Sequence, residues 1–205
     1  VLQEGKFSLF KAVGKLINLE EKAKEYESNG FAVGIGHTRW ATHGKPTELN
    51  AHPHVGQNSY VVHNGIIENY QELKTMLMRE GAQFLSQTDT EVIVHLVERY
   101  LSADFSLAEA ARQAIMQLKG AHGIVLMSVR EPDKIVAARI GNAGGVVLGF
   151  GQDEMYIASD LPALLEHTRR VAFLESRQIA IVTCQGAEIS TLDGKPVPFK
   201  IHTVS

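Results

Sequence analysis

Residues 123–141, GIVLMSVREPDKIVAARIG, hold two apolar runs on either side of a turn. The runs cover residues 123–129 and 134–139, and Glu131-Pro132-Asp133 between them is typical of a turn. The stretch therefore predicts two strands separated by a turn. Further short strands are expected at residues 146–149, 155–157, 171–174, 179–184 and 187–192. Asp193-Gly194, a strong hairpin signal, follows the last of them.

The first half of the chain mixes strands with helices. Apolar residues recur at helical spacing in residues 16–26, 70–79 and 107–118. Thr88 and Glu91 match the capping-box pattern and predict a helix that continues to Tyr100. Mixed elements followed by a strand-rich run favour an α+β layered fold with mostly antiparallel sheets. Because we find no internal repeat and no low-complexity linker, we expect one domain over residues 1–205.

The composition is that of an ordinary globular protein. Of 205 residues, 44% are hydrophobic and 21% are charged, and the formal net charge is −3. No basic surplus indicates a nucleic-acid partner, and no apolar run is long enough to cross a membrane. Cys184 is the only cysteine, so no disulfide can form within the chain. We expect Cys184 to be a small buried hydrophobe rather than a nucleophile, and the protein to be reduced and cytoplasmic.

Residues 37–65 are unlike the rest of the chain. They carry five histidines and show no clear period between residues 41 and 59, which is typical of a functional connection. Imidazole suits zinc and other transition metals, so a metal-dependent hydrolase is one reading. No carboxylate or thiolate lies at a characteristic ligand spacing, however. We therefore expect hydrogen-bonded histidines that order a long loop, with no metal and no cofactor.

Three features suit an α-amino acid as ligand. Arg39 can hold a carboxylate with two parallel hydrogen bonds, and Asp89 can hold an ammonium group. Asn64-Gly65 follows an apolar run and can offer a side-chain amide and a backbone N–H, the donor pair of an oxyanion hole. Each has a structural alternative: a surface ion pair for Arg39, a helix cap for Asp89 and a plain turn for Asn64-Gly65. The residues alone leave both interpretations open.

The order of four short motifs favours the ligand-binding interpretation of these residues. They are GHTRWATHG at residues 36–44, NAHPH at 50–54, VHNGIIENY at 62–70 and TDTEV at 88–92. This series resembles the class II glutamine amidotransferases, whose nucleophile is an N-terminal cysteine. The WATHG and NAHPH strings are similar to the branch that makes glucosamine 6-phosphate. The resemblance implies hydrolysis of glutamine to glutamate and ammonia, with the nitrogen used to convert fructose 6-phosphate to glucosamine 6-phosphate.

The resemblance also implies how the ends of glutamine are held. By analogy with the family, Arg39 binds the α-carboxylate, helped by Thr42 and His43. Asp89 takes the α-ammonium group. The implied fold is a four-layer αββα sandwich of the N-terminal nucleophile hydrolase type.

Four more residues receive roles from the resemblance. Asn64 and the backbone N–H of Gly65 stabilise the tetrahedral oxyanion. Trp40 lies where ammonia leaves the site, and His52 supports the wall of the pocket.

The sequence departs from the family at its nucleophile. It begins at Val1, and Cys184 does not match the implied N-terminal cysteine. We therefore expect the N-terminal strand of the fold and the sugar isomerase domains to be absent from this chain. Two readings remain: the glutaminase half of a larger synthase, and a catalytically inactive glutamine-binding fragment. The expected partners are L-glutamine and the sugar isomerase half, in a homo-oligomeric full-length enzyme.

Overall fold

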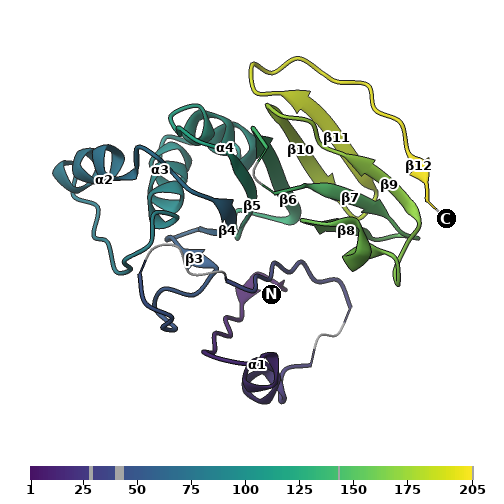
Figure 1. Cartoon of the computed structure of the whole chain (residues 1–205), viewed down its shortest axis with the longest axis horizontal. Helices are drawn as coiled ribbons and strands as arrows, with labels where there is room; N and C mark the ends of the chain where they lie inside the picture. The colour runs from purple at the N-terminus through teal and green to yellow at the C-terminus, as the bar shows by residue number, and fades with distance from the viewer. Residues whose placement is uncertain (28–29, 40–43, 143, 205) are drawn as a thin grey trace.

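The computed structural model describes residues 1–27, 30–39, 44–142 and 144–204. Figure 1 shows the helices at one side of two neighbouring sheets, with the N-terminal segment below them. In chain order the elements are β1 (Leu2–Gln3), β2 (Lys6–Phe7), α1 (Leu16–Ala23), β3 (His54–Val55), β4 (Ser59–Gly65), α2 (Tyr70–Arg79), α3 (Glu91–Leu101), α4 (Leu107–Ile115), β5 (His122–Ser128), β6 (Glu131–Ile140), β7 (Val147–Phe150), β8 (Met155–Ala158), η1 (Leu161–Leu164), β9 (Arg170–Phe173), β10 (Gln178–Thr183), β11 (Gly186–Thr191) and β12 (His202–Thr203).

The larger sheet has the order β11-β10-β6-β5-β4-β3, and all its neighbours are antiparallel. The two predicted strands are confirmed as β5 and β6, which pair as a hairpin, but the predicted turn is wrong. The chain turns at Val129 and Arg130, and Glu131 already pairs with Ser128. The register shifts at this point, so Pro132 sits in an irregular strand end where its missing N–H breaks no regular ladder.

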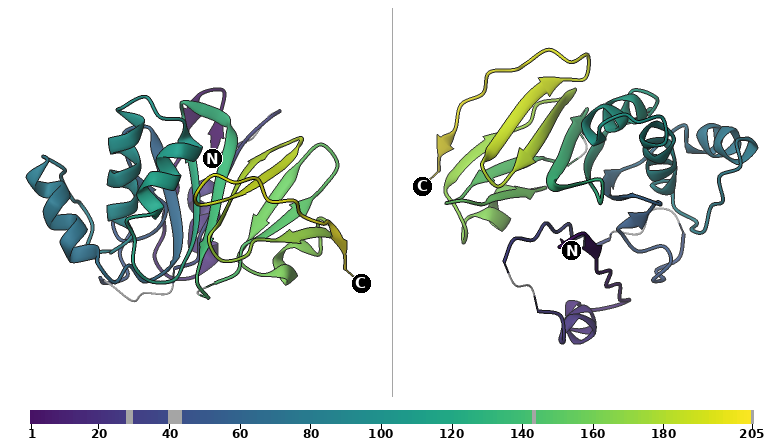
Figure 2. Two further views of the ribbon diagram at one scale, coloured as in Figure 1. Left: turned by 90° about the horizontal axis from the view of Figure 1, so that it is seen from above. Right: turned by 180° about the vertical axis from the view of Figure 1, so that it is seen from behind.

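A second sheet, with the order β12-β9-β7-β8, packs on one face of the larger sheet. Helices α2, α3 and α4 cover the other face, as the edge-on view in Figure 2 shows. Strand β10 (Gln178–Thr183) is apolar from Ile179 to Val182 because both its faces are buried: Ile179 packs toward the helices, and Ala180 and Val182 pack toward the second sheet. The α+β class with mostly antiparallel sheets is therefore confirmed.

The outer face of the second sheet is covered, within the described residues, by η1. Leu164 of η1 packs on Val147 and Val171 there. Helices, two sheets and η1 follow the layer order of the expected αββα sandwich. The first predicted helix is shorter than expected, because α1 ends at Ala23. None of its residues is buried, so it gains little from packing.

The predicted capping box at the start of α3 does not form. The N-cap is Thr90, and its side chain makes no capping hydrogen bond. The Glu91 carboxylate instead accepts hydrogen bonds from the backbone N–H groups of Leu85 and Ser86 and from the Ser86 hydroxyl. Thr88 pairs with the His54 ring. The loop before α3 is thus tied to the helix start, and this arrangement holds Asp89 and Thr90 in place.

Candidate active site

A cavity of about 430 Å³ lies where β4 ends. It is lined by His37, Thr38, Arg39, His52, His63, Asn64, Gly65, Ile66, Glu68, Thr88, Asp89, Thr90 and Ala121. Five of the predicted site residues therefore meet in one place, although they come from separate loops and from β4. The other three, Trp40, Thr42 and His43, lie outside the described residues.

Gly65 occupies a position that only glycine fits. Its φ is +140°, a conformation that L side chains rarely adopt. A Cβ at this position would stand 2.2 Å from the backbone oxygen of Ala121 and 2.9 Å from Nε2 of His63. The β4 end must therefore approach the loop before β5 closely. This close approach brings the Gly65 backbone to the cavity wall and argues against a plain surface turn.

The loop facing Gly65 is held by a set of hydrogen bonds. The Glu68 N–H donates to the Lys119 carbonyl over 3.0 Å, and the Lys119 N–H donates to Asn69 Oδ1 over 2.9 Å. Asn69 Nδ2 also donates to the carbonyl of Gln117. These bonds lock the segment after β4 against the segment before β5.

Arg39 and Asp89 give the cavity two opposite charges. The Arg39 guanidinium donates to the carbonyl oxygens of Gly44 and Lys45, each over 3.1 Å. Asp89 is only 4% exposed, and its Oδ2 accepts a 2.8 Å hydrogen bond from the Ile67 N–H. Helix α3 begins two residues later, so this carboxylate holds the β4–α2 loop rather than the helix end. A cation and a buried anion in one cavity suit a zwitterionic ligand.

Histidines and a threonine form a continuous chain of hydrogen bonds beside the cavity. Thr90 Oγ1 lies 3.2 Å from His52 Nε2 and 2.9 Å from His63 Nδ1. His63 Nε2 lies 3.0 Å from His122 Nδ1, and His122 Nε2 lies 3.2 Å from the Lys119 carbonyl. Because a carbonyl only accepts, His122 Nε2 must donate, and each ring then donates from Nε2 in turn. The expected hydrogen-bonded histidines are therefore present.

These imidazoles are neutral at pH 7. Burial, with smaller effects from His37, the other nearby histidines and Arg39, lowers the pKa of His52 to about 2. Burial and the His122 ring lower the pKa of His63 to about 3. Burial and Lys11 lower the pKa of His54 to about 4. Across the described parts of the chain, no group of three or more His, Cys, Asp or Glu side chains has the arrangement of a metal site.

Two cavity neighbours were missed by sequence reasoning. Thr90 was assigned only to a helix start, and His122 lies outside the histidine-rich stretch. No local pattern marks His122. It joins the site because β4 and β5 pair with Gly65 opposite His122, a register that appears only in the sheet. Cys184 is half-buried after β10 and does not line the cavity.

The layered fold and the charged cavity at the end of a strand are those of an amidotransferase domain. The family described as "Glutamine amidotransferase domain" matches residues 37–166. The chain belongs to this family, and the resemblance expected from its motifs is confirmed.

Curated relatives match almost the whole chain. The glutamine–fructose-6-phosphate aminotransferase (isomerizing) of Clostridium acetobutylicum is 40% identical over 206 residues, which cover 100% of this chain and 33% of the relative. The protein of the same name from Escherichia coli (strain K12) is 47% identical over 194 residues, which cover 95% of this chain and 31% of the relative. The chain thus spans about a third of the length of these relatives.

Solved structures agree on the fold. Glutamine phosphoribosylpyrophosphate amidotransferase from B. subtilis, complexed with ADP and GMP, is similar with a TM-score of 0.64 and 25% identity. The match covers 76% of this chain and 34% of that chain. A glutamine aminotransferase class-II domain protein from Silicibacter pomeroyi matches with a TM-score of 0.55 and 18% identity, covering 73% of each chain. Within the described residues, no helix has the length and apolar character needed to cross a bilayer.

Proposed function

We propose that this chain binds L-glutamine and takes part in releasing its amide nitrogen as ammonia, for transfer to fructose 6-phosphate within a larger enzyme. One observation carries the proposal: a single cavity is lined by the Arg39 cation, the buried Asp89 carboxylate and the Asn64-Gly65 pair. The names of the relatives support the transfer of nitrogen to fructose 6-phosphate.

The proposed binding mode follows from charge. Arg39 pairs with the α-carboxylate of glutamine, and Asp89 pairs with its α-ammonium group. Both ends of the zwitterion are then held, and the side-chain amide projects along the cavity. His52 and Thr90 shape one part of the wall with neutral, hydrogen-bonded groups. We assign supporting contacts to Trp40, Thr42 and His43 on the resemblance alone.

The proposed chemistry is acyl transfer. Attack by a cysteine thiolate on the glutamine amide carbon forms a C–S bond and moves the carbonyl electron pair onto oxygen. The tetrahedral oxyanion accepts hydrogen bonds from Asn64 Nδ2 and the Gly65 N–H. Collapse of this intermediate breaks the C–N bond and, with a proton, releases ammonia. Water then hydrolyses the thioester to glutamate. In this scheme the described residues bind, orient and stabilise charge, and the attacking cysteine is the N-terminal residue that the resemblance implies.

Calorimetric titration of this chain tests the binding step. L-glutamine should bind, and glutaramic acid, which lacks the α-ammonium group, should bind more weakly because Asp89 then faces no cation. Asp89→Asn keeps an oxygen for the Ile67 N–H but removes the charge. Asp89→Asn should therefore weaken the binding of L-glutamine and leave the binding of glutaramic acid nearly unchanged. Equal affinity for both ligands in the unaltered chain would refute the assignment of Asp89.

We further propose that residues 1–205 act as one cytoplasmic domain beside a sugar isomerase half, in a homo-oligomeric enzyme. The relatives are about three times the length of this chain, which leaves room for such a partner. Light scattering on the protein as its gene encodes it tests the oligomeric state. A monomer at micromolar concentration would refute that part.

A further inference from the structure

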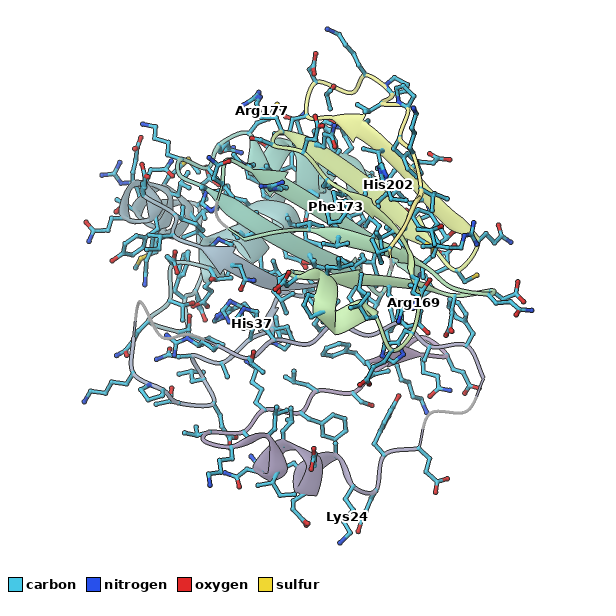
Figure 3. All side chains as sticks on the ribbon, turned by 45° about the vertical axis from the view of Figure 1, so that its right-hand side comes forward. Lys24, His37, Arg169, Phe173, Arg177 and His202 are labelled. Atoms are coloured by element: carbon cyan, nitrogen blue, oxygen red, sulfur yellow. The ribbon has the colours of Figure 1, made fainter. Side chains whose placement is uncertain are left out.

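The His37 ring stands between two cavities. His37 and Asn64 line both the 430 Å³ cavity and a second cavity of about 310 Å³ next to it. The ring lies between the sheets and the N-terminal segment, as Figure 3 shows. Its Nε2 is 2.7 Å from Oδ1 of Asn64. No role was given to His37 by the motifs or by the binding scheme above.

The direction of this hydrogen bond can be deduced. Oδ1 carries only lone pairs, so Nε2 of His37 must carry the hydrogen. His37 Nδ1 is buried, and no hydrogen-bond partner for it exists among the residues that the structure describes. A bare Nδ1 leaves one unused lone pair, whereas a hydrogen at that position would be a buried N–H without an acceptor, which native structures rarely tolerate.

The surroundings of the ring also affect its pKa. Burial lowers the pKa of His37, but hydrogen bonds to the Asn64 side chain and the His63 backbone partly raise this pKa again. Hydrogen bonds that favour the protonated ring are bonds that the ring donates. The bond to the Asn64 side chain is therefore one that Nε2 of His37 donates.

The ring is also held in place from its other side. It lies against the His52 ring at a tilt, with 4.2 Å between ring centroids and 35° between the ring planes. His52 is bonded to Thr90 at the end of the histidine chain that reaches Lys119. Rotating the His37 ring would therefore disturb a buried, hydrogen-bonded neighbour.

We infer that His37 is a positioning residue that fixes the amide of Asn64, so that Oδ1 is occupied and Nδ2 is presented to the oxyanion. This inference rests on the proposed function. Without the His37 hydrogen, the Asn64 amide can turn by 180° and offer Oδ1, an acceptor, to a developing negative charge. The same residue would then repel the intermediate that it should stabilise.

Two substitutions of His37 separate positioning from packing. In His37→Gln the amide nitrogen takes the place of Nε2 and can still donate to Asn64. In His37→Asn the shorter amide reaches only the place of Nδ1, so the donor is lost. Ammonia release should be measured in the protein as its gene encodes it, with circular dichroism as the folding control.

The two variants should differ in turnover. His37→Asn should lower kcat by about 10- to 100-fold, below the 10²- to 10³-fold loss known for removing an oxyanion donor, because the misplaced amide still samples the correct orientation. Its KM for glutamine should stay within about twofold, and His37→Gln should recover kcat to within about threefold. Equal losses in the two variants, or a loss confined to KM, would overturn the inference.

A direct measurement of the tautomer needs neither enzyme activity nor a substituted protein. Long-range proton–nitrogen NMR of the ¹⁵N-histidine-labelled chain reads the tautomer of each ring. The inference requires a neutral His37 with its hydrogen on Nε2 at pH 7, and a hydrogen on Nδ1 would overturn it. Failure of L-glutamine to bind in calorimetry would instead remove the proposed function, while the tautomer would still decide the orientation of Asn64.

Discussion

Replacing Gly65 by alanine should destabilise the fold more than the same change at a glycine of similar backbone conformation. Gly186 is the matched control, because its φ is +151° against +140° for Gly65. A Cβ on Gly186 meets no heavy atom within 4 Å, whereas a Cβ on Gly65 meets the Ala121 oxygen at 2.2 Å. Both variants carry backbone strain of about 1–3 kcal/mol. Only Gly65→Ala must also displace a neighbouring backbone.

The additional loss of stability in Gly65→Ala can be estimated from the hydrogen bonds of the loop that must move. Two of the hydrogen bonds that hold this loop pass through the backbone of Lys119: Glu68 N–H donates to the Lys119 carbonyl, and Lys119 N–H donates to Asn69 Oδ1. Each contributes about 1 kcal/mol, so Gly65→Ala should lose about 2 kcal/mol more than Gly186→Ala. With a urea dependence of about 2 kcal/mol per molar, its unfolding midpoint should lie about 1 M lower than that of Gly186→Ala.

Urea unfolding followed by circular dichroism measures this difference. The slopes of the two transitions must agree for the midpoints to be compared. Coincident midpoints would mean that the loop before β5 yields without cost. The tight approach of β4 to that loop would then not explain why glycine stands at position 65.

Three more predictions concern charge. Burial alone would raise the pKa of Glu91, but the nearby His95 ring and hydrogen bonds from Ser86 and the Leu85 N–H lower this pKa to about 2. The stability that Glu91 provides is therefore present above pH 4.5 and lost as the pH falls toward 2. Glu91→Gln should flatten the stability measured by urea unfolding across that window. Burial and the His122 ring lower the pKa of His63 from 6.5 to about 3, so neutral His63 stabilises the fold above pH 6.5 and this contribution is lost as the pH falls toward 3. NMR should find the His63 ring neutral at pH 5. A charged ring at that pH would contradict its burial. Arg39→Ala should weaken glutamine binding by about 2–5 kcal/mol in calorimetry. Lys45→Ala is the control, because it keeps the backbone carbonyl that Arg39 contacts, and it should leave glutamine binding unchanged. Equal glutamine affinities of the two variants would remove Arg39 from the site.

Local sequence patterns predicted a helix or strand well where the residues of that segment alone decide its structure. The β5–β6 hairpin follows from two apolar runs with a short connection, and the apolar run of β10 follows from burial on both faces. The turn at Glu131-Pro132-Asp133 was predicted in the wrong place, because pairing of Glu131 with Ser128 extends the strand through the proline. Turn residues mark where a chain can bend, but the sheet decides where it does.

The capping box shows the same limit at a helix start. Thr88 and Glu91 have the right spacing, yet each has a partner outside the helix: His54 for Thr88, and the Leu85 and Ser86 backbone for Glu91. These partners become available only when the loop before α3 and strand β3 are packed together. A pattern of four residues carries no information about partners elsewhere in the fold that compete for the same side chains.

By itself, the sequence determined the α+β class, the family and five residues that share one cavity: Arg39, His52, Asn64, Gly65 and Asp89. These depend on residue chemistry and on periods of a few residues, which a sequence displays directly. The tertiary structure alone decided that His122 meets His63, that His37 bonds to Asn64, and that Gly65 lies against Ala121. Such contacts depend on strand register and on loops that close over long separations, because hydrogen-bond directions and close backbone approaches exist only once the sheets are paired.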